Sequence, residues 1–88
     1  MPKVRLVMAQ TNPIVGDISG NLAQTLTAID EARASGANMV VFGEMNLSGY
    51  PIEDLAAREN FVQAAVQAVE SLATTLQADQ YSGMCVVV

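Results

Sequence analysis

Residues 38–55 read NMVVFGEMNLSGYPIEDL, and this stretch decides the fold. Its first five residues form a short run that is rich in β-branched side chains and shows no polar alternation. Such a run is typical of a buried strand in a parallel sheet. Gly43 and the carboxylate Glu44 follow directly, and then a segment of turn-forming residues begins. The stretch therefore predicts a buried strand that ends in a loop carrying Glu44.

Strands and helices alternate on both sides of this stretch. Residues 4–9 (VRLVMA) and 84–88 (MCVVV) are two further predicted strands, and a second helix is predicted over about residues 59–78. The first helix is expected between Asp17, a candidate N-cap, and Gly36, which stands where a left-handed C-terminal cap is expected. The order β-α-β-α-β predicts an α/β fold with parallel strands joined by right-handed crossovers.

Each predicted helix carries apolar residues at helical spacing. In the first helix these residues are Leu22, Leu26, Ile29 and Ala32. In the second helix they are Val62, Ala65, Val66, Val69, Leu72, Ala73 and Leu76. We expect both sets to face the sheet.

Two helices cover one face of a three-stranded sheet at best, so the other face and an edge are expected to be exposed and apolar. The sequence also stops inside its last strand, at Val88, without a turn or polar tail. Residues 1–88 are therefore expected to be the N-terminal portion of a longer domain. We also expect the isolated chain to self-associate and cover its open sheet.

Composition narrows the class of protein. The 88 residues are 51% hydrophobic and 15% charged, too apolar for a disordered segment. Nine acidic residues outnumber four basic ones, giving a net charge of −5. The basic residues are scattered, which argues against nucleic-acid binding. They are Lys3, Arg5, Arg33 and Arg58.

Other features argue against a membrane segment and a metal site. No stretch approaches the roughly 20 apolar residues that span a membrane, and the apolar run at residues 6–9 is too short for a signal peptide. With no histidine and a single cysteine, a zinc site lacks ligands and a disulfide framework is impossible. We expect a cytoplasmic protein without a metal or cofactor in this segment.

Glu44 is the first candidate for chemistry. Reactive groups in open parallel α/β folds gather beyond the carboxyl ends of the strands, where loops converge. Neighbouring loops there can partly bury a carboxylate, an environment suited to a general base. The alternative is a solvated turn glutamate, and spacing alone favours that alternative.

The residues around Glu44 resemble the first catalytic segment of the carbon–nitrogen hydrolase (nitrilase) superfamily. The similarity lies in Phe42, Gly43 and Glu44 followed by the turn LSGY at residues 47–50. The continuation YPIEDL and the opening QTNPIVGD, residues 10–17, are most similar to the glutaminase domain of glutamine-dependent NAD synthetases. The resemblance implies that residues 1–88 begin a nitrilase-like α-β-β-α sandwich. Proline usually stands in that family where this chain has Gly43.

The resemblance also implies a mechanism with a Cys-Glu-Lys triad in which Glu44 is the general base. Lys3 precedes the first strand and does not match the family lysine. Cys85 is surrounded by apolar residues, without the family's cysteine motif, and is expected to be a buried small hydrophobe. The isolated chain is therefore expected to lack the nucleophile and to be inactive.

Tyr50, six residues after Glu44, has two interpretations. By resemblance it is a substrate-pocket or gate residue. Otherwise it is an aromatic side chain that packs on the turn and donates a local hydrogen bond.

Three functions stay open at this point. In the first, the segment opens the glutaminase domain of a glutamine-dependent NAD synthetase, with glutamine as substrate and with ATP and Mg²⁺ used by an absent synthetase domain. In the second, the parent is another amidase or nitrilase of the superfamily. In the third, the chain is a non-catalytic βαβ module whose role is interaction.

Overall fold

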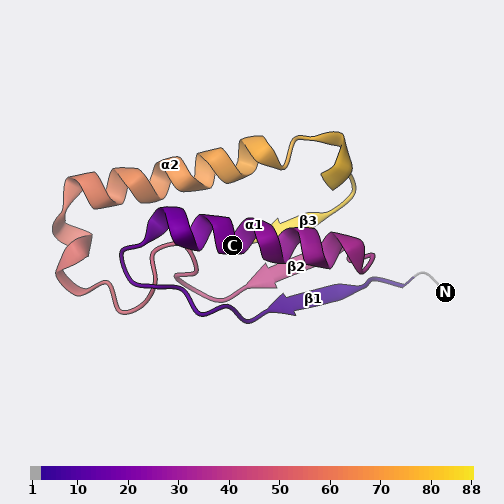
Figure 1. Ribbon diagram of the computed structural model, residues 1–88, viewed down its shortest axis with the longest axis horizontal. Helices are drawn as coiled ribbons and strands as arrows, with labels where there is room; N and C mark the ends of the chain where they lie inside the picture. The colour runs from indigo at the N-terminus through magenta and orange to yellow at the C-terminus, as the bar shows by residue number, and fades with distance from the viewer. Residues whose placement is uncertain (1–2) are drawn as a thin grey trace.

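The computed structural model describes residues 3–88 and confirms the predicted order of elements (Figure 1). The strands are β1 (Leu6–Ala9), β2 (Met39–Phe42) and β3 (Cys85–Val87), and the helices are α1 (Ile18–Ala34) and α2 (Glu59–Thr75). Two short 3-10 segments, η1 (Glu53–Ala57) and η2 (Asp79–Tyr81), flank α2 in the chain. Among the described residues, neither helix is long and apolar enough to cross a membrane.

The three strands form one parallel sheet in the order β1-β2-β3. The register places Leu6, Met39 and Cys85 in one row across the sheet, and Met8, Val41 and Val87 in another. Because side chains alternate between faces along a strand, these two rows share one face. The sheet is therefore parallel throughout, as predicted, with β2 in its centre.

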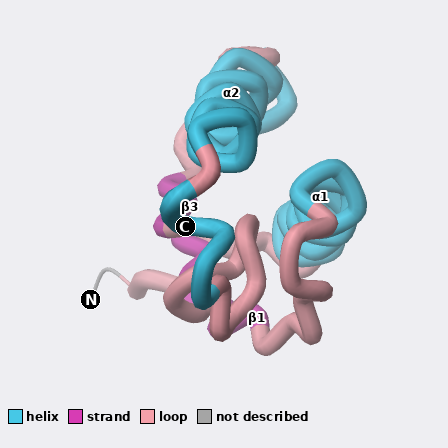
Figure 2. Tube along the Cα trace, turned by 90° about the vertical axis from the view of Figure 1, so that its left-hand side faces the viewer, coloured by secondary structure: helices cyan, strands magenta, loops and turns pink. Residues whose placement is uncertain are grey.

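Both helices lie on the opposite face of this sheet (Figures 1 and 2). Ile29 of α1 and Val40 of β2 are completely buried, and Leu72 of α2 and Phe42 complete the centre of the core. The Tyr81 ring closes one end, and its hydroxyl donates a 2.6 Å hydrogen bond to Oδ1 of Asp30. The core thus joins the two helices, α1 and α2, to the central strand β2.

The other face of the sheet is open, as expected. Leu6 is 51% exposed and Met8 is 70% exposed, although both are strand residues. Cys85 lies on this face and is exposed, so the prediction that it is a buried small hydrophobe is wrong. The reason is the register: Cys85 pairs with Met39, on the side of the sheet that the two helices leave uncovered.

Helix boundaries agree with the predicted caps. Oδ1 of Asp17 accepts a hydrogen bond from the Gly20 amide at 3.1 Å, and Gly36 follows α1 with a φ of +80°. The second helix ends at Thr75, three residues before the predicted end. The Leu76 amide still bonds to the Leu72 carbonyl, and tighter turns follow it.

The buried face of α2 differs from the predicted one. Its buried residues are Ala68 and Leu72, whereas Val66, on the predicted face, is 53% exposed. Val62 and Val69 are exposed as well. Smaller side chains face α1 because they allow the two helices to approach, and the valines are left as an outward stripe.

Candidate functional site

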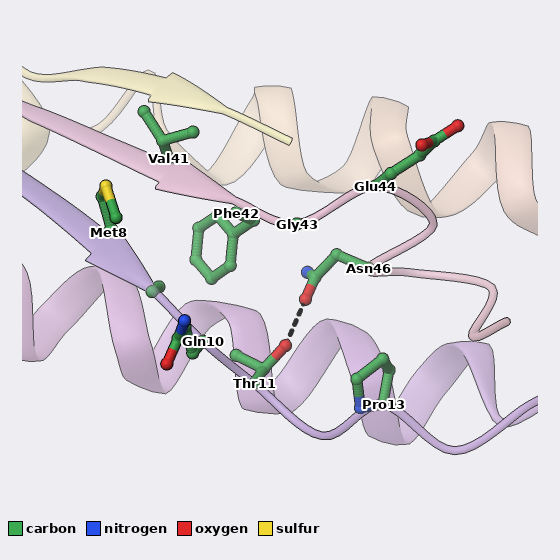
Figure 3. A pocket seen from close by; sticks show the side chains of 10 residues that line it. Met8, Gln10, Thr11, Pro13, Val41, Phe42, Gly43, Glu44 and Asn46 are labelled. Atoms are coloured by element: carbon green, nitrogen blue, oxygen red, sulfur yellow. Dashed lines mark hydrogen bonds between the residues drawn. The ribbon is translucent and has the colours of Figure 1, made fainter.

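A hollow of about 450 Å³ lies at the carboxyl ends of β1 and β2 (Figure 3). Segments 8–13 and 41–46 form its walls, so the residues that follow two neighbouring strands meet there. This is the place where parallel α/β folds collect functional groups. Its polar side chains are Gln10, Thr11, Glu44 and Asn46.

Glu44 lies at the rim of this hollow, in the turn that follows β2. Its side chain is exposed, and Figure 3 shows the carboxylate directed away from Asn46 and Thr11. No hydrogen bond joins it to another residue of the part of the chain that the structure describes. The expected partial burial by neighbouring loops is therefore not observed: a side chain placed at Gly43 would meet no atom within 4 Å, so this side of the turn is open.

A chain of hydrogen bonds holds the same turn from its other side. Oδ1 of Asn46 accepts a 2.5 Å bond from the Thr11 hydroxyl, in the segment after β1. Nδ2 of Asn46 donates to Oγ1 of Thr25 on α1 at 2.6 Å. Asn46 is only 5% exposed, so a strand-exit turn, a second strand-exit loop and a helix are joined in a buried environment.

Asn21 makes a second connection between the two loops. Its Oδ1 accepts from the Ile14 amide, and its Nδ2 donates to the Ile14 and Leu47 carbonyls, all at 2.8 Å. Asn21 is 3% exposed and lies one turn before Thr25 on α1. One helix therefore satisfies backbone groups of both loops.

Gly49 lies where the backbones of the two loops contact each other. Its φ is +78°, and a Cβ at this position would lie 2.6 Å from Cα of Val15 and 2.7 Å from its nitrogen. The Gly16 amide also donates to the Ser48 carbonyl at 2.9 Å. The backbones approach so closely here that a side chain does not fit.

Replacing Gly49 with alanine is expected to destabilise the fold by about 2 to 3 kcal/mol, since the change combines a left-handed φ with overpacking against backbone atoms. Urea denaturation monitored by circular dichroism measures this loss. Gly83 is the matched control, because it has a φ of +83° but a Cβ added there would meet no atom within 4 Å. We expect Gly83→Ala to lose only the left-handed part, about 1 to 2 kcal/mol. Equal losses in the two variants would contradict the close-approach argument.

The structure does not bring the other predicted residues to the hollow. Tyr50 is 77% exposed and is not among the residues that line it. Cys85 begins β3, whereas Glu44 follows the far end of β2, so the two lie at opposite ends of the sheet, more than about 10 Å apart at 3.3 Å per strand residue. Lys3 precedes β1 and is exposed. Within residues 3–88 no three potential metal-ligating side chains are grouped together.

Sequence reasoning missed Asn21, Thr25 and Asn46. A signal for the first two was present: the buried positions of α1 are Ile18, Asn21, Thr25, Ile29 and Ala32, a regular helical spacing with two polar members. The apolar pattern used for prediction followed Leu22 and Leu26 instead, and both of these are only partly buried. A buried polar pair on a helix requires partners, and these are the loops that carry the site.

Comparison with known proteins identifies the class. The family model for carbon-nitrogen hydrolases matches residues 5–88. The chain belongs to the carbon-nitrogen hydrolase family, which confirms the resemblance seen in the sequence.

Individual similar proteins narrow the comparison within this family. A glutamine-dependent NAD(+) synthetase of Thermotoga maritima is 41% identical over 63 residues, which are 72% of this chain and 11% of that protein. One of Rhodobacter capsulatus is 37% identical over 71 residues, 81% of this chain and 13% of that protein. An aliphatic nitrilase of Sinorhizobium fredii is 39% identical over 51 residues, 58% of this chain and 17% of that protein. The chain thus spans only 11–13% of the length of these two synthetases.

Proposed function

We propose that residues 1–88 form the N-terminal portion of a glutaminase domain that supplies ammonia for NAD synthesis. The observation that carries this proposal is the position of Glu44: it follows the central strand, at the rim of a hollow, on a turn held by buried hydrogen bonds. The similarity to glutamine-dependent NAD(+) synthetases supports glutamine as the substrate.

In this proposal Glu44 is the general base of a Cys-Glu-Lys mechanism, with the cysteine and lysine contributed by later parts of the polypeptide. The carboxylate takes the thiol proton, and the thiolate attacks the amide carbon of glutamine. The lysine stabilises the oxyanion, the C–N bond breaks, and the proton held by Glu44 leaves with ammonia. A water molecule, deprotonated by Glu44, then attacks the thioester carbon; the C–S bond breaks, the proton passes from Glu44 to the cysteine sulfur, and glutamate is released.

The hollow suits this role because its open rim leaves room for these partners. Glu44 is exposed, and the apolar face of the sheet beside it is uncovered. In this proposal ATP and Mg²⁺ are bound by a separate synthetase domain outside residues 1–88. Tyr50, exposed near the same turn, contacts substrate only after further chain packs beside it.

A second candidate is a nitrilase-type activity, favoured by the similarity to the aliphatic nitrilase. Both candidates imply a longer polypeptide that carries this segment, and assays of that polypeptide distinguish them. We expect ammonia release from L-glutamine and NAD formation with glutamine as nitrogen donor. Ammonia release from an aliphatic nitrile, with none from glutamine, would favour the second candidate and reject the first.

The 88-residue chain alone is expected to release no ammonia from glutamine. Its only thiol, Cys85, lies at the opposite end of the sheet from Glu44, and its only lysine precedes β1. An enzyme-coupled ammonia assay checks this prediction. Release above the buffer rate that disappears in the Glu44→Gln variant of the same chain would contradict it.

We also propose that the isolated chain self-associates through its open sheet face. Met8, on the edge strand β1, is 70% exposed on that face, so Met8→Lys places a charge in the contact and is expected to shift the chain toward monomer. Val66→Lys is the matched control, because Val66 is similarly exposed but lies on α2. Size-exclusion chromatography with light scattering reads out the mass. A wild-type chain that stays monomeric at high concentration would refute the proposal.

A further inference from the structure

The hydrogen bonds around Asn46 form a chain with a single direction. The Thr25 hydroxyl donates to the Asn21 carbonyl at 2.8 Å, so its oxygen is left to accept from Asn46. The amide nitrogen of Asn46 must therefore face Thr25, and its oxygen must face Thr11. The Thr11 hydroxyl proton then points to Asn46. Each of the two hydroxyl protons has one partner, and this arrangement allows only one orientation of the Asn46 side chain.

The chain of bonds is buried where it meets α1. Thr25 and Asn46 are both among the buried polar residues, and no buried side-chain nitrogen or oxygen among residues 3–88 lacks a hydrogen bond. An unpaired polar group in such a place is costly, so any movement of Asn46 must break or replace two bonds at once. Asn46 is therefore a fixed point of the fold.

Glu44 lies between two fixed points. Phe42 is buried two residues before it, and Asn46 is buried two residues after it. Gly43 does not hold Glu44 by packing, because it lies in open space. Met45, on the other side, is half-buried with a left-handed φ of 60°, and its carbonyl accepts from the Gly49 amide at 2.8 Å. The direction in which the Glu44 backbone leaves β2 therefore depends on the turn that follows, and the Asn46 side chain anchors that turn to Thr11 and Thr25.

We propose that Asn46 is a positioning residue for Glu44, and that it acts through its bonds to Thr11 and Thr25. This inference rests on the proposed function, since it gives Glu44 the role of general base. Asn46 also lines the hollow, but both of its side-chain hydrogen bonds are made to Thr11 and Thr25. The bond from Asn46 to Thr11, in the loop after β1, fixes the position of Glu44 relative to the hollow, which Thr11 also lines.

Thr11→Val in the longer polypeptide is the main test. Valine keeps the shape of threonine but removes the donor to Asn46, and Thr11 is only partly buried, so the fold is expected to survive. We expect kcat for glutamine hydrolysis to fall about 10- to 100-fold with an unchanged KM, because a small misplacement of a catalytic group costs this much. Thr11→Ser restores the donor and is expected to restore kcat.

If the bond between Thr11 and Asn46 had only a structural role, Thr11→Val would lower the melting temperature and the fraction of folded enzyme. The value of kcat per titrated active site would then stay at the wild-type value. Amide hydrogen exchange at residues 44–46 gives an independent readout, with faster exchange expected in Thr11→Val and wild-type exchange in Thr11→Ser.

The outcomes separate this inference from the proposed function. If the wild-type protein does not hydrolyse glutamine, or if Glu44→Gln retains the activity, the proposed function fails and the inference fails with it. If Glu44 is essential but Thr11→Val keeps the wild-type kcat and the wild-type exchange rates, the positioning role alone is overturned. Asn46→Ala provides a second variant, expected to show a loss of kcat at least as large as that of Thr11→Val.

Discussion

Under the proposed function, replacing Glu44 with glutamine in the full-length enzyme is expected to lower kcat for glutamine hydrolysis by roughly 10²- to 10⁴-fold, the usual contribution of a general base. A carboxamide has nearly the same size as the carboxylate, but it cannot take the thiol proton. NAD formation from added ammonia should continue, because that reaction needs no amide hydrolysis. Comparing glutamine-supported with ammonia-supported synthesis measures the loss directly.

Stability should not change in this variant. Glu44 is exposed and forms no hydrogen bond with another described residue, so the free energy of unfolding should stay within about 0.5 kcal/mol of the wild-type value. Glu53→Gln is the matched control: Glu53 is also exposed, and it begins η1 nine residues further along the chain. We expect wild-type activity in Glu53→Gln. Full activity in Glu44→Gln would remove the basis of the proposed function.

The order of elements was predictable because each one carries a local signal. A β-branched run without polar residues predicts β2. Asp17 accepts a hydrogen bond from the first turn of α1, as expected of an N-cap, and Gly36 takes the left-handed φ expected after the helix. These signals depend only on residues that are close together in the sequence. The open face of the sheet was predictable too, from counting two helices against three strands.

The faces of the helices were harder to predict. Val69 lies three residues before Leu72, at helical spacing, yet it is 48% exposed, while the smaller Ala68 is buried against α1. Hydrophobicity alone ranks valine above alanine as a core residue. The close approach of two helices reverses that ranking, and the approach depends on a partner that the local pattern does not reveal.

The candidate site shows the same division. Glu44 was predictable from its place after a strand and from its motif, but its exposure was not, because exposure depends on which segments pack above the turn. Asn46 gave no local signal, and the helical spacing of Asn21 with other buried positions of α1 did not reveal its partners, because these two residues bond to loops distant in sequence. Buried polar residues of this kind emerge only when the loops that they join are known.

Replacing Asn21 with leucine is the structural prediction with the largest expected effect. The side chains are similar in size, but leucine leaves the Ile14 amide and the Ile14 and Leu47 carbonyls without their partner. An unsatisfied buried group costs about 1 to 3 kcal/mol, and water at the partly open loops recovers some of it. We therefore expect a loss of about 3 to 5 kcal/mol, a large part of the stability of a small domain. Urea denaturation measures this loss in the free energy of unfolding, and we expect the slope of that free energy against urea concentration to stay unchanged.

Asn12→Leu is the control for this experiment, because Asn12 lies in the same loop but is exposed. We expect it to change stability by less than about 0.5 kcal/mol. A similar loss in both variants would show that added hydrophobic surface, and not lost hydrogen bonds, destabilises the loop. The size of the Asn21 effect also bears on the site, since Asn21 and Asn46 hold the same two loops from opposite sides of Thr25. If Asn21→Leu unfolds the loops while the core of Ile29 and Val40 persists, amide exchange will rise at residues 44–49 and stay low in β2.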